Sequence, residues 1–203
     1  MLLRSIATFL LLLGAGLAQA ATILVWGDSL SAGYGLKAAE AWPSLLQTRL
    51  QQQGFPHRVV NASVSGETSA GGRSRLPAAL AEHKPDIVVL ALGANDGLRG
   101  LRPQLMTGNL NAMVADARSA GARVLLVGMQ MPPNYGAAYT RNFARAYSEL
   151  ASEHRLPFVP FLMEGFATRP EMFLADGIHP NAAAQPQVLD TIWAELKPLL
   201  DAR

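Results

Sequence analysis

Residues 23–30 of this 203-residue chain read Ile-Leu-Val-Trp-Gly-Asp-Ser-Leu. The apolar run 23–26 ends at Gly27, and Asp28 and Ser29 follow directly. A short apolar run bounded by turn residues is typical of a strand that is buried on both faces. The sequence therefore predicts a buried strand whose end carries a serine hydroxyl. A plainer interpretation is that Asp28 or Ser29 only caps the next helix.

The same pattern recurs along the chain. Short apolar runs predict five strands, at residues 22–26, 57–61, 86–92, 123–129 and 157–159. Between them, apolar residues at helical spacing occupy residues 42–50, 106–117, 143–151 and 188–200. Alternating strands and helices predict an α/β fold with a five-stranded parallel sheet and helices on both faces. In the strand order 2-1-3-4-5, Ser29 and Asn95 would meet at the carboxyl edge of the sheet, where such folds bind ligands.

The first 20 residues differ in kind from the rest. Arg4 precedes the apolar stretch 6–17, and Ala18-Gln19-Ala20 follows it. This is the pattern of a secretory signal with a cleavage site after Ala20, and the stretch is shorter than the roughly 20 apolar residues that span a membrane. We therefore expect a signal peptide at residues 1–20, one domain at residues 21–203, secretion across the inner membrane and no stable membrane anchor after cleavage.

Composition excludes several classes of function. The chain has no cysteine, so it has neither a cysteine nucleophile nor a thiolate metal site. Its 17 Lys and Arg nearly balance 15 Asp and Glu, and no basic cluster of the kind that binds nucleic acid is present. The four histidines lack the spacing of metal ligands, so no metal site is expected. Nothing in the sequence demands more than a monomer, and a monomer is expected.

Three further blocks follow Ser29 along the chain and hold residues that an acyl-transfer site could use. A serine hydroxyl is a weak nucleophile until a base removes its proton, and a histidine oriented by a carboxylate is a common solution. The pair Asp176 and His179 is close enough in sequence for one turn to carry both. Taken alone, this pair also fits a helix cap followed by a solvated histidine. The blocks are Ser65-Gly66-Glu67-Thr68, Gly93-Ala94-Asn95-Asp96 and Asp176-Gly177-Ile178-His179.

Acyl transfer also needs hydrogen-bond donors for the negative oxygen that develops on the substrate. The candidate donors are the backbone N–H groups of Ser29 and Gly66 and the side-chain amide of Asn95. Singly, Gly66 fits a turn glycine and Asn95 fits ordinary turn chemistry equally well. Asp28 is interpreted as a local anchor of the turn that carries Ser29.

The four blocks resemble the signature blocks of the SGNH or GDSL-type hydrolases, whose Ser, Gly, Asn and His correspond to Ser29, Gly66, Asn95 and His179. The longer stretches 26–35, 61–68, 92–100 and 176–180 are similar above all to the bacterial periplasmic acyl-CoA thioesterase I and lysophospholipase group. The resemblance implies a three-layer flavodoxin-like fold, a periplasmic location, and hydrolysis of thioesters, aryl and alkyl esters and lysophospholipids without a cofactor. The chain departs from the pattern at Pro186, which interrupts the expected start of the last helix.

The leading hypothesis is a serine esterase or thioesterase that acts on small-molecule acyl esters through an acyl-enzyme on Ser29. Two alternatives stay open: a carbohydrate acetylesterase, and a non-catalytic binding module on the same fold. Two loops that flank the predicted site are apolar rather than acidic, which favours an acyl chain as ligand. The residues expected to bind the substrate are Leu98, Leu101, Met131, Pro132 and Tyr135.

Overall fold

The structure is a computed structural model, and it describes residues 21–201. The predicted signal peptide at residues 1–20 lies outside the described residues. No helix within residues 21–201 is both long enough and apolar enough to cross a membrane.

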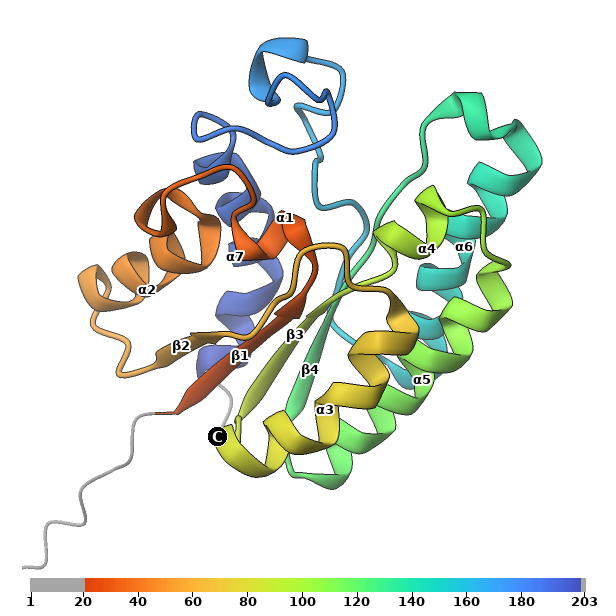
Figure 1. Ribbon diagram of the computed structural model, residues 1–203. Helices are drawn as coiled ribbons and strands as arrows, with labels where there is room; N and C mark the ends of the chain where they lie inside the picture. The colour runs from red at the N-terminus through yellow and green to blue at the C-terminus, as the bar shows by residue number, and fades with distance from the viewer. Residues whose placement is uncertain (1–20, 202–203) are drawn as a thin grey trace, which may run out of the picture.

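A five-stranded parallel sheet forms the centre of the molecule, as predicted (Figure 1). The strand order is β2-β1-β3-β4-β5, which is the order that places the first and third strands side by side. The strands β1 and β3 are buried along their whole lengths, in agreement with their continuous apolar sequences. The strands are β1 (Thr22–Gly27), β2 (Arg58–Asn61), β3 (Ile87–Ala91), β4 (Arg123–Val127) and β5 (Phe158–Val159).

Helices cover both faces of the sheet. Figure 1 shows α2 and α7 together on one face and α3 and α5 on the other, with α6 packed beside α5. Three short 3-10 helices lie in the connections, η1 (Ala38–Glu40), η2 (Pro133–Tyr135) and η3 (Pro170–Met172). The α-helices are α1 (Ser29–Ala32), α2 (Trp42–Gln52), α3 (Ser69–His83), α4 (Ala94–Leu98), α5 (Pro103–Ser119), α6 (Ala137–His154) and α7 (Gln185–Asp201).

The register of β1 against β3 positions the site. Gly27, the last residue of β1, pairs with Ala91, the last residue of β3. The chain therefore leaves both strands at the same edge, and the segments that carry Ser29 and Asn95 begin side by side.

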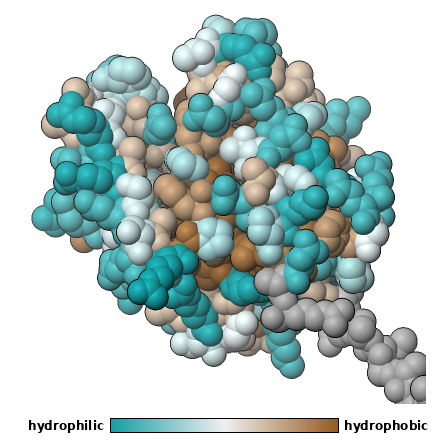
Figure 2. Space-filling view, turned by 180° about the vertical axis from the view of Figure 1, so that it is seen from behind, coloured by the Kyte–Doolittle hydropathy of each residue, from teal (hydrophilic) through white to brown (hydrophobic). Residues whose placement is uncertain are grey.

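The view from behind shows apolar residues gathered in a hollowed face with polar residues around it (Figure 2).

Pro186 does not interrupt the last helix, so that expectation was wrong. Helix α7 begins at Gln185, which puts Pro186 in its first turn. Backbone N–H groups of a first turn have no partner within the helix, so the absence of one on proline costs little there. The chain between Pro180 and Gln185 forms a turn in which the Asn181 side chain accepts from the backbone N–H groups of Ala183 and Ala184, at 3.0 and 3.3 Å.

Helix α3 is the long helix that the apolar spacing did not reveal. It contains Gly71, Gly72 and Pro77, none of which favours a helix interior. Close packing explains Gly72, because a Cβ there would lie 2.2 Å from the Leu92 side chain. The buried face of the helix therefore begins with the small residues Ser69 and Gly72, and its apolar side chains, Leu76, Ala79 and Leu80, come only in the second half.

Candidate active site

Ser29 is the first residue of α1, directly after β1. The Asp28 side chain caps this short helix by accepting a hydrogen bond of 3.0 Å from the Leu30 backbone N–H. Gly27 allows the sharp turn, since a Cβ there would lie 2.8 Å from the Ser31 hydroxyl. The capped turn holds the Ser29 hydroxyl 2.9 Å from Nε2 of His179.

Asp176 holds His179 in two ways. Its Oδ1 accepts hydrogen bonds from the backbone N–H groups of Ile178 and His179 at 2.9 and 3.0 Å, which fixes the turn. Its Oδ2 lies 2.7 Å from Nδ1 of the His179 ring, which fixes the imidazole. The hydrogen bonds from the two backbone N–H groups, with the ring of His179 after them, lower the pKa of Asp176 to about 2. A carboxylate therefore faces the imidazole at neutral pH, and the other ring nitrogen faces Ser29.

The three candidate oxyanion donors lie on three neighbouring segments. Gly66 has a φ of +80°, which favours glycine, and Asn95 lies in the first turn of α4. The Asn95 amide donates to the Glu67 carbonyl at 2.9 Å and lies 3.4 Å from Oδ2 of Asp28. Within residues 21–201, the backbone N–H groups of Ser29 and Gly66 donate no hydrogen bond. They are therefore free to bind a substrate oxygen.

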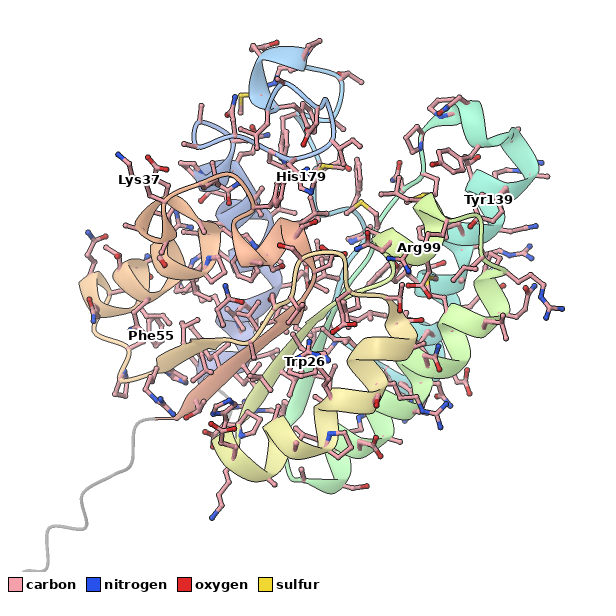
Figure 3. The ribbon with its side chains drawn as sticks, viewed as in Figure 1. Trp26, Lys37, Phe55, Arg99, Tyr139 and His179 are labelled. Atoms are coloured by element: carbon pink, nitrogen blue, oxygen red, sulfur yellow. The ribbon has the colours of Figure 1, made fainter. Side chains whose placement is uncertain are left out.

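Charged side chains for which the sequence predicted no role also support this edge of the sheet. The Asp96 carboxylate is buried and accepts from both the backbone N–H and the hydroxyl of Ser69, at 2.7 and 2.6 Å. Arg75 pairs with Glu67 at 2.6 Å, and its guanidinium lies 4.2 Å from the centre of the Trp26 ring, which Figure 3 labels beside the sheet. Glu67 and Asp96 belong to the blocks that hold Gly66 and Asn95. Their positions next to these two residues in the sequence could therefore have indicated a supporting role.

Arg99 ties the Gly66 turn to the end of α4. Its guanidinium donates a hydrogen bond of 3.1 Å to the Gly66 carbonyl. In Figure 3, Arg99 lies beside α4, and His179 lies above α1 at the carboxyl end of the sheet. The turn that carries one candidate donor is thus anchored to the helix that carries another.

A pocket of about 670 Å³ opens next to Ser29 and His179. One wall is the segment 129–133 after β4, and the other is the segment 161–168 after β5. The second wall has no regular apolar spacing, so the sequence pattern gave no sign of it. Most of the lining side chains are apolar, among them Leu30, Leu98, Met129, Met131, Pro132, Pro133, Phe161, Met163, Phe166, Phe173 and Ile178.

Three of the five predicted substrate-binding residues, Leu98, Met131 and Pro132, line this pocket, whereas Leu101 and Tyr135 do not. The Tyr135 hydroxyl donates to the Leu98 carbonyl at 3.1 Å, so its side chain braces the end of α4. The Leu101 carbonyl accepts from the Tyr139 hydroxyl at 2.8 Å, in a loop outside the pocket. The structure therefore does not place Leu101 and Tyr135 in this pocket, and their contact with substrate stays a prediction.

Comparisons with known proteins show which family the chain is similar to. The model of the GDSL-like lipase/acylhydrolase family matches residues 25–185. The esterase TesA of Pseudomonas aeruginosa is 53% identical over 183 residues, which cover 90% of this chain and 91% of that protein. The Escherichia coli K12 thioesterase 1/protease 1/lysophospholipase L1 is 45% identical over 193 residues, which cover 95% of this chain and 91% of that protein. A crystal structure of TesA superimposes with a TM-score of 0.86 at 53% identity, over 88% of this chain and 99% of that one.

Asp28 makes stability depend on pH. Burial raises its pKa from 3.8 to about 6, although the Leu30 N–H and His179 act in the opposite direction. A carboxyl whose pKa is raised by folding favours the folded state below about pH 4, and that contribution is lost as the pH rises through about 6. In urea unfolding, the free energy of unfolding of Asp28→Asn should therefore rise relative to that of wild type by up to about 3 kcal/mol as the pH increases from 4 to 7.

The matched control is Asp116→Asn, at an exposed position of α5. Its free energy of unfolding relative to wild type should stay the same across this pH range. A difference between Asp28→Asn and wild type that does not change with pH would contradict the prediction.

Proposed function

The chain belongs to the GDSL-like lipase/acylhydrolase family and is a serine esterase, and we propose that Ser29 is its nucleophile. The observation that carries the proposal is the line of contacts from Asp176 through His179 to the Ser29 hydroxyl, at 2.7 and 2.9 Å. Hydrogen-bond reach between nucleophile and base, with a third group orienting the base, is the geometry that this chemistry requires.

In the first half of the reaction, Nε2 of His179 takes the hydroxyl proton as Ser29 Oγ attacks the substrate carbonyl. Asp176 stabilises the imidazolium that forms, because its carboxylate faces Nδ1. The tetrahedral intermediate then expels the alkoxide or thiolate, to which His179 returns the proton. An acyl-enzyme on Ser29 remains.

In the second half, a water molecule attacks the acyl-enzyme and gives its proton to Nε2 of His179. The acid product leaves as Ser29 recovers a proton from the imidazolium. In both halves the substrate oxygen becomes negative, and the backbone N–H groups of Ser29 and Gly66 and the Asn95 amide would bind it. The unpaired state of the two N–H groups supports this assignment.

We propose acyl esters and acyl thioesters as the substrates, with lysophospholipids among them. The support is the apolar pocket next to Ser29, together with relatives named as an esterase and as a thioesterase and lysophospholipase. A carbohydrate acetylesterase would need polar groups to bind a sugar, whereas methionine, proline and phenylalanine dominate the walls.

We also propose that residues 1–20 direct the chain to the periplasm and are removed from it. The support is the sequence pattern alone: a basic residue, an apolar stretch and Ala18-Gln19-Ala20. Mass spectrometry of the protein isolated from the periplasm should give Ala21 as the first residue.

Ser29→Ala tests the nucleophile. A fluorophosphonate should label Ser29 in the wild type, and the variant should lose both labelling and hydrolysis of p-nitrophenyl butyrate. Ser31→Ala is the matched control, because Ser31 lies on the same short helix with a buried hydroxyl that has no hydrogen-bond partner within residues 21–201. It should keep both activities, and full activity in Ser29→Ala would refute the mechanism.

Asn95→Ala tests the oxyanion donor. Loss of one such donor lowers kcat by roughly 10²- to 10³-fold, and KM should change little because the donor binds the transition state more tightly than the substrate. The control is Asn111→Ala on α5, where the side chain contacts His154 and does not line the pocket. An effect of Asn95→Ala on KM alone would mean that Asn95 only binds substrate.

The pocket predicts a preference for medium acyl chains. Each buried methylene contributes up to roughly 0.8 kcal/mol, so kcat/KM should rise at least tenfold from acetyl to hexanoyl or octanoyl p-nitrophenyl esters. Met163→Ala should flatten the rise, because Met163 lines the pocket, whereas Leu105→Ala, outside it, should not. A series in which acetate is the best substrate would favour the acetylesterase alternative.

A further inference from the structure

Tyr34 covers one face of the His179 ring. The two ring centres are 4.5 Å apart, and the ring planes are inclined by 36°. Tyr34 is 52% exposed, so it is not a core residue, whereas the His179 side chain is 18% exposed. Within residues 21–201, the Tyr34 hydroxyl makes no hydrogen bond, so the face of its ring is the part that contacts the site. A half-exposed aromatic side chain is therefore held against the proposed base.

The turn that carries Ser29 also carries Tyr34. Helix α1 ends in Gly33, which has a φ of +77°, and the Tyr34 backbone N–H donates to the Ser29 carbonyl at 3.2 Å. The backbone of Tyr34 is therefore held next to that of Ser29.

The same turn is also locked against the segment that carries His179. Gly35 has a φ of +74°, and a Cβ there would lie 2.6 Å from the Leu174 side chain. Leu174 in turn donates a backbone hydrogen bond of 2.8 Å to the His179 carbonyl. The backbone that carries Tyr34 is thus packed closely against the loop that carries His179.

We propose that Tyr34 is a positioning residue that holds the His179 imidazole in line with the Ser29 hydroxyl. This inference rests on the proposed function, in which His179 is the base. Asp176 holds the ring at Nδ1 and Ser29 holds it at Nε2, and both contacts lie at the edge of the ring, so neither opposes a tilt about the line that joins them. Contact with the face of Tyr34 opposes the tilt.

The need for this support is greatest in the acyl-enzyme. There Ser29 Oγ is part of an ester and has no proton to donate, so Nε2 loses its partner just when it must accept a proton from water. The electron-rich face of the tyrosine ring also favours the imidazolium that each half of the reaction forms, together with the nearby carboxylates of Asp176 and Asp28. The support acts on the chemical steps and not on substrate binding.

The test compares aromatic and non-aromatic replacements of Tyr34. In Tyr34→Leu and Tyr34→Met, kcat for p-nitrophenyl butyrate and the rate of fluorophosphonate labelling of Ser29 should both fall roughly three- to tenfold, the size expected when one aromatic pair is lost. KM should stay within about twofold of the wild-type value. Tyr34→Phe keeps the ring face and should restore kcat and labelling to near wild type. Leu105→Ala, at a position of similar exposure, is the control and should change none of these rates.

A spectroscopic measurement gives a readout that does not depend on turnover. The carbon-bound protons of the His179 ring should carry a ring-current shift in wild type and in Tyr34→Phe. The shift should disappear in Tyr34→Leu and Tyr34→Met. With only four histidines in the chain, the His179 signals can be assigned by their loss in His179→Gln.

The outcomes separate this inference from the proposed function. Hydrolysis by Ser29→Ala would defeat the proposed function, whatever Tyr34 does. With Ser29 established as the nucleophile, an unchanged kcat in the non-aromatic variants would overturn the role of Tyr34. A change in KM alone would also overturn it, because that would make Tyr34 a substrate contact. If both non-aromatic variants failed to fold while Tyr34→Phe folded, the role would be structural and the proposal wrong.

Discussion

The parallel pairing of β1 with β3 is the constraint on which the rest of the site depends. Because Gly27 pairs with Ala91 at the ends of the two strands, α1 and α4 both begin at the same edge of the sheet. That register brings the Asp28 carboxylate to 3.4 Å from the Asn95 amide without any long connecting segment. A shift of one residue would turn alternate side chains to the opposite face of the sheet and separate the two groups.

Around this edge of the sheet, carboxylates hold the segments that carry the proposed oxyanion donors and the ring of the proposed base, His179. Asp96 attaches the start of α3 through Ser69, and Asp176 organises both the backbone and the ring of His179. Burial of such carboxylates costs free energy unless each oxygen has a partner. Both oxygens of Asp96 have these partners, and both oxygens of Asp28 have one each, yet burial still raises the pKa of Asp28. The folded protein therefore bears the free-energy cost of ionising the buried Asp28 carboxyl.

The sequence predicted the sheet well because strands buried on both faces must be continuously apolar. All five predicted strands exist, and the two at 86–92 and 123–129 end earlier than expected, where the chain turns toward the site. The apolar spacing did not reveal helix α3, because the first half of its buried face consists of Ser69 and Gly72, which pack closely against their neighbours. Composition alone does not report such local contacts.

The candidate site was predictable to a different degree. Ser29, Asp176 and His179 come together as their blocks indicated, because each block lies on a short turn whose position follows from the sheet or from its own hydrogen bonds. Of the two pocket walls, the sequence indicated the segment 129–133 through Met131 and Pro132, but not the segment 161–168. The segment 161–168 has no periodic pattern, and the tyrosine at position 135 uses its hydroxyl for a backbone contact that no local pattern indicates.

The two walls of the pocket follow β4 and β5, and β5 is a two-residue strand at the border of the sheet. The groups proposed to carry out the reaction lie instead on segments that follow β1, β2 and β3, and on the turn before α7. The segments that shape the pocket and the residues proposed to carry out the reaction are therefore separate parts of one chain. Mutations that enlarge or narrow the cleft at the border strand disturb few contacts of the central strands, so this architecture can acquire new substrates while its reaction stays the same.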